Sequence, residues 1–166
     1  MMKHRVWLAV ALAALAVGPG LAQDAQPAPQ QAAAVPYVLS MGDMMNTLVQ
    51  PRHAKLALAA AAENWPLAGY ALVEIRQAFA GIVKAQPRFH GMPVGELADA
   101  ALAKPLAAVE AAIRQKDPAQ FAAAYDQLTQ GCNACHVALD HPYVIIKTPD
   151  ASAFPNQEFG PLRRRP

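Results

Sequence analysis

The sequence lacks three patterns that would indicate a common enzyme class: a Ser-His-Asp set, paired carboxylates in a defined scaffold, and a glycine-rich phosphate-binding loop. Before Pro142 it also lacks any useful stretch of alternating apolar and polar residues, which excludes a sheet as the main element. No unbroken apolar run reaches the roughly 20 residues that a membrane-spanning helix needs. We therefore expect a helical protein that is not an enzyme.

The first 22 residues have the composition of an export signal. Lys3 and Arg5 precede the apolar run 6–17, and small residues follow it up to Ala22. We predict cleavage after Ala22 and a periplasmic location for the remaining chain. Loss of this leader would lower the basic side chains from 14 to 12, equal to the 12 acidic ones. The overall charge of +2 therefore gives no reason to expect binding to nucleic acid.

Residues 23–36 are rich in Ala, Gln and Pro and have no periodic apolar pattern, so we expect a flexible lead-in there. Over residues 37–142 helix formers dominate, and capping residues and prolines divide them into segments. These features predict an all-α fold, an antiparallel four-helix bundle with one apolar seam. The expected helices run from Ser40 to Ala62 with a kink at Pro51, from Asn64 to Ala85, from Val94 to Gln115 with Pro105 able to split it, and from Asp117 to His141.

Two segments are expected to lie outside these helices. Gln86–Pro93 carries two prolines and a glycine, so it is predicted to be a connection. Residues 143–166 contain four prolines and are predicted to form an irregular, extended tail packed on the bundle surface. Within this tail, Phe154 and Phe159 are the candidates to cover the edge of a bound cofactor.

The motif that carries the chemistry is C-x-x-C-H at Cys132, Cys135 and His136, the attachment pattern of c-type haem. Two thiols form thioethers with the porphyrin vinyl groups, and the imidazole becomes the proximal iron ligand. On a helix the three residues stand at i, i+3 and i+4, so they share one face. We therefore predict one covalent haem c on the last helix of the bundle. The same face carries the apolar side chains of Phe121, Tyr125, Leu128 and Leu139.

Two other interpretations of the cysteine pair stay open. A thiol-disulfide protein would use Cys132 and Cys135 as a redox pair, although such pairs need a helix N-terminus to lower the thiol pKa. A zinc site would need further ligands, and without a second cysteine pair His90 and His141 would have to supply them.

Four helices with this motif on the last one resemble the class II c-type cytochromes, the cytochrome c-prime group and its low-spin relatives. The segments MNTLVQPRHAKLALAAAAENWPLAGY, YDQLTQGCNACHVALDHPYVIIKTP and FPNQEF are similar to a family of small exported proteins described as cytochrome c or haem-binding proteins. The resemblance covers about residues 40–160. The chain departs from c-prime in one respect, because about 30 residues follow His136 where c-prime chains stop soon after.

The resemblance implies one-electron transfer with a periplasmic redox partner protein, after haem attachment by the cytochrome c maturation machinery. It leaves open a homodimer, since class II relatives often pair through their first two helices. A haem whose iron keeps an open sixth position would instead bind NO or CO, as c-prime does.

Low-spin relatives use a methionine of the first helix as the sixth iron ligand. Met45 is the first candidate here, because helical spacing places it on one face with Met41 and Leu48. Met41 and Met44 are weaker candidates. His53 is the alternative, and it would give bis-imidazole ligation. Two basic residues near His53, Arg52 and Lys55, are candidates for contacts with haem propionates.

Overall fold

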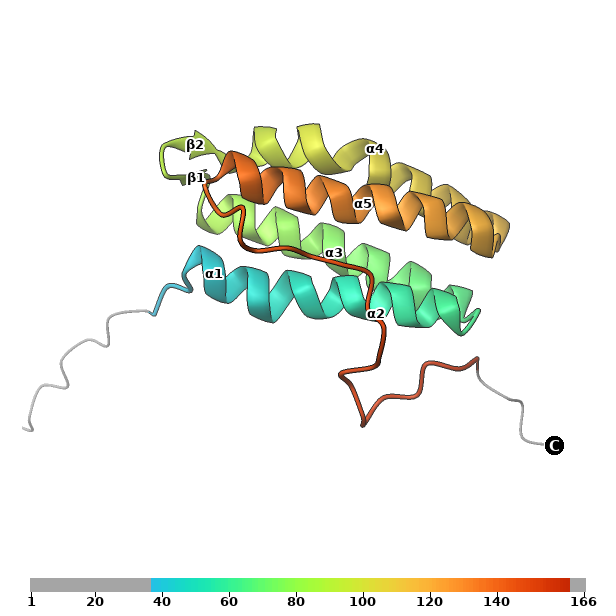
Figure 1. Cartoon of the computed structure of the whole chain (residues 1–166). Coiled ribbons are helices and arrows are strands. Elements are labelled where there is room, and N and C mark those ends of the chain that lie inside the picture. Colours follow the sequence, from blue (N-terminus) through green and yellow to red (C-terminus); the bar gives the residue numbers. More distant parts are fainter. Residues whose placement is uncertain (1–36, 162–166) are drawn as a thin grey trace, which may run out of the picture. The chain divides into compact units, whose positions relative to one another are not determined.

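The computed structural model describes residues 37–161, which form four long helices. The first is a continuous run of α1 (Met41–Met44), a π-helical segment η1 (Met45–Val49) and α2 (Gln50–Ala61). The others are α3 (Trp65–Ala85), α4 (Val94–Gln115) and α5 (Pro118–Ala138), with two short strands, β1 (Arg88–Phe89) and β2 (Met92–Pro93), between α3 and α4. The helices pack antiparallel, most closely α4 with α5 and α2 with α3, so the predicted four-helix bundle is confirmed (Figure 1). The predicted leader, the lead-in and the last five residues lie outside the described part.

Side-chain caps start three of the four helices at the predicted residues. Ser40 accepts a hydrogen bond from the Asp43 amide at 3.0 Å, and the Asp43 carboxylate accepts one from the Ser40 amide at 3.1 Å. Asn64 caps α3 through the Leu67 amide at 3.2 Å, and Asp117 caps α5 through the Gln120 amide at 2.9 Å. Each cap satisfies amide groups that have no partner inside the helix.

The disturbance expected at Pro51 takes the form of η1, which ends two residues before the proline. There the Gln50 amide bonds the carbonyl of Met45, five residues back. Pro51 has no N–H to offer the carbonyl of Thr47, and its ring crowds that carbonyl, so a wider turn relieves the conflict. The first helix therefore stays continuous while its phase shifts around Met45.

The predicted segment from Val94 to Gln115 is one helix, α4, and the split that Pro105 could have caused does not occur. Pro105 leaves the carbonyl of Ala101 without its helical donor. Gly131 of α5 lies against this carbonyl: a Cβ atom on Gly131 would lie 2.5 Å from the Ala101 oxygen. Tight packing between α4 and α5 thus holds α4 together at the point where the sequence indicates a break.

The predicted connection between α3 and α4 contains a small hairpin that was not expected. Arg88 pairs with Pro93 and Phe89 with Met92 in antiparallel register. His90 and Gly91 form the turn with φ angles of 48° and 80°, which is the conformation of a two-residue hairpin loop. The hairpin lies at the end of the bundle where α1 begins and α5 ends (Figure 1).

The helix α5 ends at Ala138, three residues before the predicted end at His141. Asp140 adopts a left-handed conformation with φ of 62°, and the amide of His141 bonds the carbonyl of His136 at 2.8 Å. This turn reverses the chain before Pro142 is reached. The following tail runs from this end of α5 across the bundle toward the turn between α2 and α3 (Figure 1).

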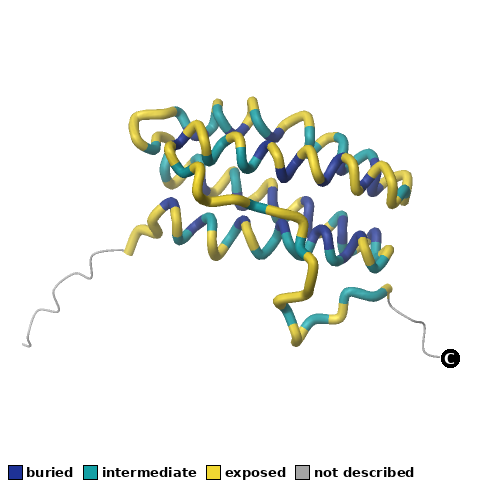
Figure 2. The backbone as a smooth tube through the Cα atoms, in the orientation of Figure 1, coloured by how far each residue is buried: buried dark blue, intermediate teal, exposed yellow. Residues whose placement is uncertain are grey.

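Buried residues lie on the facing sides of the helices (Figure 2). The main cluster joins α2, α3, α4 and α5. A second cluster lies at the hairpin end and contains Met41, Met44, Val49, Ala78, Ile82 and Val94. Within residues 37–161, no helix is both long and apolar enough to cross a membrane.

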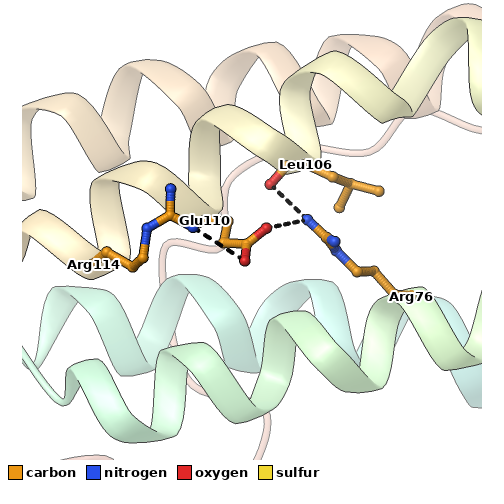
Figure 3. A network of polar contacts seen from close by, with 4 residues as sticks. All are labelled: Arg76, Leu106, Glu110 and Arg114. Atoms are coloured by element: carbon orange, nitrogen blue, oxygen red, sulfur yellow. Dashed lines mark hydrogen bonds and ion pairs between the residues drawn. The ribbon is translucent and has the colours of Figure 1, made fainter.

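A polar network ties α3 to α4 on the surface (Figure 3). Arg76 pairs with Glu110 at 2.7 Å and also donates to the carbonyl of Leu106 at 3.4 Å. Arg114 pairs with the second oxygen of Glu110 at 3.2 Å. Because these side chains are about half exposed, each pair contributes at most about 1 kcal/mol. The network helps to orient the two helices, whereas the apolar clusters supply most of the stability.

Candidate functional site

An apolar groove opens between the first helix and α5, at the hairpin end of the bundle. It holds about 970 Å³ of space between protein atoms, a volume that includes its solvent-open mouth. Its walls come from the first helix, α3, α4, α5, the hairpin and the tail. The residues that line it are Met41, Gly42, Met45, Asn46, Val49, Gln50, His53, Phe79, Phe89, Leu102, Cys132, Cys135, His136, Leu139, His141, Val144 and Ile146.

All three residues of the C-x-x-C-H motif line this groove. Cys132, Cys135 and His136 stand in the last two turns of α5, and each is half-buried. No disulfide joins the two cysteines. Their spacing on the helix places both thiols and the imidazole along one wall, opposite the first helix. A single ligand in the groove can therefore contact all three side chains.

The imidazole of His136 is oriented by the tail. Its Nδ1 donates a hydrogen bond to the backbone carbonyl of Val144, at 2.8 Å. Because a carbonyl can only accept, this contact places the proton on Nδ1 and leaves a lone pair on Nε2. Among residues 37–161, no group hydrogen-bonds that Nε2. A metal-binding histidine is commonly held in this way by a partner on its other nitrogen.

The two thiols are not activated for disulfide exchange. Burial, with a smaller contribution from Cys135, raises the pKa of Cys132 from 9.0 to about 11. Burial also raises the pKa of Cys135. A redox pair needs a lowered thiol pKa, which a helix N-terminus or nearby cations supply. Both cysteines instead lie near the C-terminal end of α5, where the helix dipole disfavours a thiolate.

The methionines of the first helix fall into two groups. Met41 and Met45 line the groove across from the motif. Met44 is not among the groove residues, because it is buried in the apolar cluster between the first helix, α3 and α4. Met45 is half-buried and reaches the groove without belonging to the core, whereas Met41 is 6% exposed and packs in it. Of the three, Met45 is the most accessible to a ligand.

His53 also borders the groove, but both of its ring nitrogens are engaged. The hydroxyl of Thr129 donates to the carbonyl of Tyr125 at 2.9 Å, so it accepts from Nε2 of His53, 3.1 Å away. The hydroxyl of Tyr125 lies 2.8 Å from Nδ1 and 2.9 Å from the backbone oxygen of His53. Breaking these contacts would leave buried polar groups without partners. The network therefore disfavours His53 as a metal ligand.

The burial of the His53 ring predicts a loss of stability in acid. It lowers the pKa of His53 from 6.5 to about 4, so between these values the unfolded chain binds a proton that the folded chain rejects. The contribution of the neutral ring is complete above pH 6.5 and is lost as the pH falls. From this residue we expect about 2 kcal/mol less stability at pH 5 than at pH 7. Urea unfolding at both pH values measures the difference.

A His53→Gln variant serves as the control for this pH effect, because glutamine does not titrate. It is expected to be less stable than the wild type at pH 7, but with a smaller change between pH 7 and pH 5. An equal pH dependence in both proteins would contradict the assignment to His53.

The two candidate propionate contacts lie elsewhere. Arg52 forms an ion pair with Glu74 of α3 at 3.3 Å and donates to the carbonyl of Leu48 at 2.6 Å. The ammonium of Lys55 stands over the ring of Phe154, 4.8 Å from its centre. Neither Arg52 nor Lys55 lines the groove. The structure therefore does not bring these two side chains together with the motif.

The tail contributes to the groove through residues other than the expected ones. Val144 and Ile146 line it. The ring of Phe154 instead lies under the ammonium of Lys55. Phe159 packs on the main core, and its carbonyl accepts a hydrogen bond from Asn64. The apolar run 143–146 is the sequence feature that could have indicated the wall residues.

The other walls carry no local sequence signature. Phe79, Phe89 and Leu102 enter the groove from α3, the hairpin and α4, and only the packing of the bundle brings them together. Within residues 37–161, no three His, Cys, Asp or Glu side chains are arranged to hold a metal ion between them. The rings of His90 and His141 lie side by side, with their centres 5.8 Å apart. The zinc interpretation thus lacks a ligand set in this part of the chain.

The described residues form a four-helix all-α domain with an apolar groove that presents two thiols and an oriented imidazole. The chemistry has to be inferred from these residues, because no protein-family model, curated protein or solved structure matches the chain.

Proposed function

We propose that this protein is a monohaem c-type cytochrome of the class II kind, exported to the periplasm, that transfers single electrons. Cys132 and Cys135 would hold one haem c through thioethers, and His136 would be the proximal iron ligand. The observation that carries the proposal is the arrangement of these three side chains on one apolar groove, with Nδ1 of His136 bonded to Val144 at 2.8 Å and its Nε2 available.

The groove residues fit this cofactor in their chemistry. Haem is a flat, mostly apolar group, and the lining consists largely of aliphatic, aromatic and methionine side chains. When bound, it supplies a one-electron iron couple whose potential depends on axial ligands and burial. The protein supplies the attachment points, the orientation of His136 and a wall that keeps water from most of the group. A one-electron carrier needs no further reactive residue.

The raised thiol pKa values are compatible with this role. Thiols that stay protonated in the folded protein are poor nucleophiles for disulfide exchange. In the proposed route, thioether formation happens during maturation, before the bundle closes around the groove. The thiol-disulfide alternative predicts that alkylating reagents label both cysteines of the mature protein after reduction, and covalent haem would block that labelling.

Purification of the exported chain from a host that expresses the cytochrome c maturation machinery tests the proposal. We expect an intact mass that exceeds the mass of the cleaved polypeptide by one haem, and a haem-stained band on a denaturing gel. A mature chain with two free thiols and no added mass would overturn it. The position of the new N-terminus in the same spectrum tests cleavage after Ala22.

The sixth ligand is expected to be Met45. It reaches the groove opposite the motif, while both ring nitrogens of His53 are hydrogen-bonded. A thioether opposite an imidazole raises the reduction potential, which suits an electron carrier. We expect Met45→Ala to convert a low-spin oxidised spectrum to a high-spin one and to lower the potential. Absorption spectroscopy and a redox titration measure both effects.

Met44→Ala is the matched control for this prediction, because Met44 is the neighbouring methionine but is buried in the core. It is expected to lower stability and to leave the spectrum low-spin. If the wild-type protein is high-spin and binds carbon monoxide in the reduced state, the five-coordinate alternative replaces Met45 ligation. If only His53→Ala changes the spin state, His53 is the ligand.

A further inference from the structure

Three hydrogen bonds tie the first part of the tail to the motif helix. The side-chain amide of Asn133 donates to the carbonyl of Ile146 at 2.9 Å, and its oxygen accepts from the amide of the same residue at 2.7 Å. Nδ1 of His136 donates to the carbonyl of Val144 at 2.8 Å. Asn133 and His136 lie three residues apart on α5, and they contact Ile146 and Val144, two alternate residues of the tail. We call this arrangement the tail clasp.

We propose that Asn133 is a positioning residue: through the tail clasp it holds the carbonyl of Val144 where it fixes the imidazole of His136. This inference rests on the proposed function, in which His136 binds the haem iron. Asn133 itself does not line the groove. It acts through the tail.

The clasp is the main restraint on this part of the tail. Residues 143–146 belong to no helix or strand, and Tyr143 and Ile145 are about three-quarters exposed. The apolar burial of these two side chains is therefore small, and Val144 and Ile146 add only partial burial at the groove. Within this segment, the other backbone bond joins the Val144 amide to the His141 carbonyl, at 3.0 Å. That bond stays inside the turn and does not connect the tail to the motif.

Only a primary amide of this length can make both contacts with Ile146. A peptide unit offers one donor and one acceptor, and the asparagine side chain presents the complementary pair. Aspartate has the same size but two acceptors, so it would face the Ile146 carbonyl with an oxygen. Alanine removes both contacts, although it favours the helix more than asparagine does. Neither replacement is expected to hold the tail.

Two consequences at the site follow from the clasp. The Val144 carbonyl fixes the protonated nitrogen and the rotation of the His136 ring, which keeps Nε2 directed at the groove. Val144 and Ile146 also form one wall of the groove, so the clasp positions this wall together with the ligand. Release of the tail would loosen both at once.

The test compares the haem-loaded wild type with full-length Asn133→Ala and Asn133→Asp variants. In ¹⁵N-edited NMR of the reduced protein, the Nδ1 proton of His136 is expected to be protected in the wild type and to exchange with water about 5 to 30 times faster in both variants, the factor for losing one or two net hydrogen bonds. Hydrogen exchange of the peptide that covers residues 142–148, followed by mass spectrometry, is expected to speed up by a similar factor.

Gln130→Ala is the matched control. Gln130 lies one turn earlier on α5 and is exposed, and among residues 37–161 its side chain bonds only Asp126 of the same helix, at 2.6 Å. It should leave both exchange rates unchanged. A variant whose bundle has loosened as a whole would unfold at a lower temperature, and its peptides from α2 and α3 would also exchange faster. These two measurements identify such a variant.

The outcomes separate the two proposals. Haem-loaded variants in which the Nδ1 proton and the tail peptide remain as protected as in the wild type would overturn the role of Asn133 and leave the proposed function standing. Protection retained by Asn133→Asp alone would also overturn it, because a steric role would then suffice. A wild-type chain that acquires no haem overturns the proposed function itself, and the link to iron with it.

Discussion

Under the proposed function, replacing Cys132 and Cys135 together with alanine is expected to abolish covalent haem attachment. The chain contains no other cysteine, so no second thiol can substitute for either one. Each single replacement leaves one thioether and should give a reduced yield of haem-stained protein. The denaturing gel and the intact mass measure attachment directly. His136→Ala is expected to keep the thiols but to lose the proximal ligand, which the absorption spectrum reports.

Ala134→Ser is the control for this experiment, because Ala134 lies between the two cysteines and is exposed. It tests whether any change inside the motif disturbs maturation, and it is expected to be loaded like the wild type. Haem that stays with the double cysteine variant on a denaturing gel would contradict attachment at these residues. Equal loading of all single variants would show that one thioether is sufficient.

Three of the four helix starts were predictable because a few adjacent residues encode each of them. Ser40, Asn64 and Asp117 can accept amide hydrogen bonds in the first turn, and the prolines at 66 and 118 suit the first turn of a helix. Such local chemistry does not depend on the rest of the fold. The motif face was predictable for the same reason, since the i, i+3 and i+4 spacing alone fixes which side of α5 the three residues share.

Features that tertiary packing decides were less predictable. Pro105 indicates a break, but contact with α5 keeps α4 continuous. The end of α5 depends on the left-handed residue Asp140, and aspartate is only one of several residue types that adopt this conformation. The propionate contact of Arg52 stays a prediction based on charge, and the structure adds that Glu74 on the neighbouring helix pairs with that side chain.

The tail clasp illustrates the same limit at the site. The residues between the two cysteines are unrestricted in the C-x-x-C-H pattern, so Asn133 carried no information by itself. Its partner Ile146 lies 13 residues away, beyond a turn whose geometry the sequence does not specify. The sequence therefore indicated which atoms could bind haem, and the fold indicates what holds them.

Gly131→Ala is expected to lower the free energy of unfolding by about 2 to 3 kcal/mol, the upper part of the range for overpacked sites. The new Cβ would lie 2.5 Å from the backbone oxygen of Ala101 and 3.0 Å from Leu102. A backbone oxygen cannot rotate away as a side chain can, so α5 must shift from α4. Since Cys132 follows directly and Leu102 lines the groove, the shift should also reduce haem loading.

Gly81→Ala provides the matched control, because Gly81 is exposed within α3 and its new Cβ would meet nothing within 4 Å. It is expected to raise stability by about 0.5 to 1 kcal/mol, since alanine favours a helix over glycine. Denaturant unfolding of both variants is therefore expected to give changes of opposite sign in the free energy of unfolding, although the substitution is the same. If Gly131→Ala were also stabilising, the close approach of α5 to the Ala101 carbonyl would be wrong, and with it the explanation for the uninterrupted helix at Pro105.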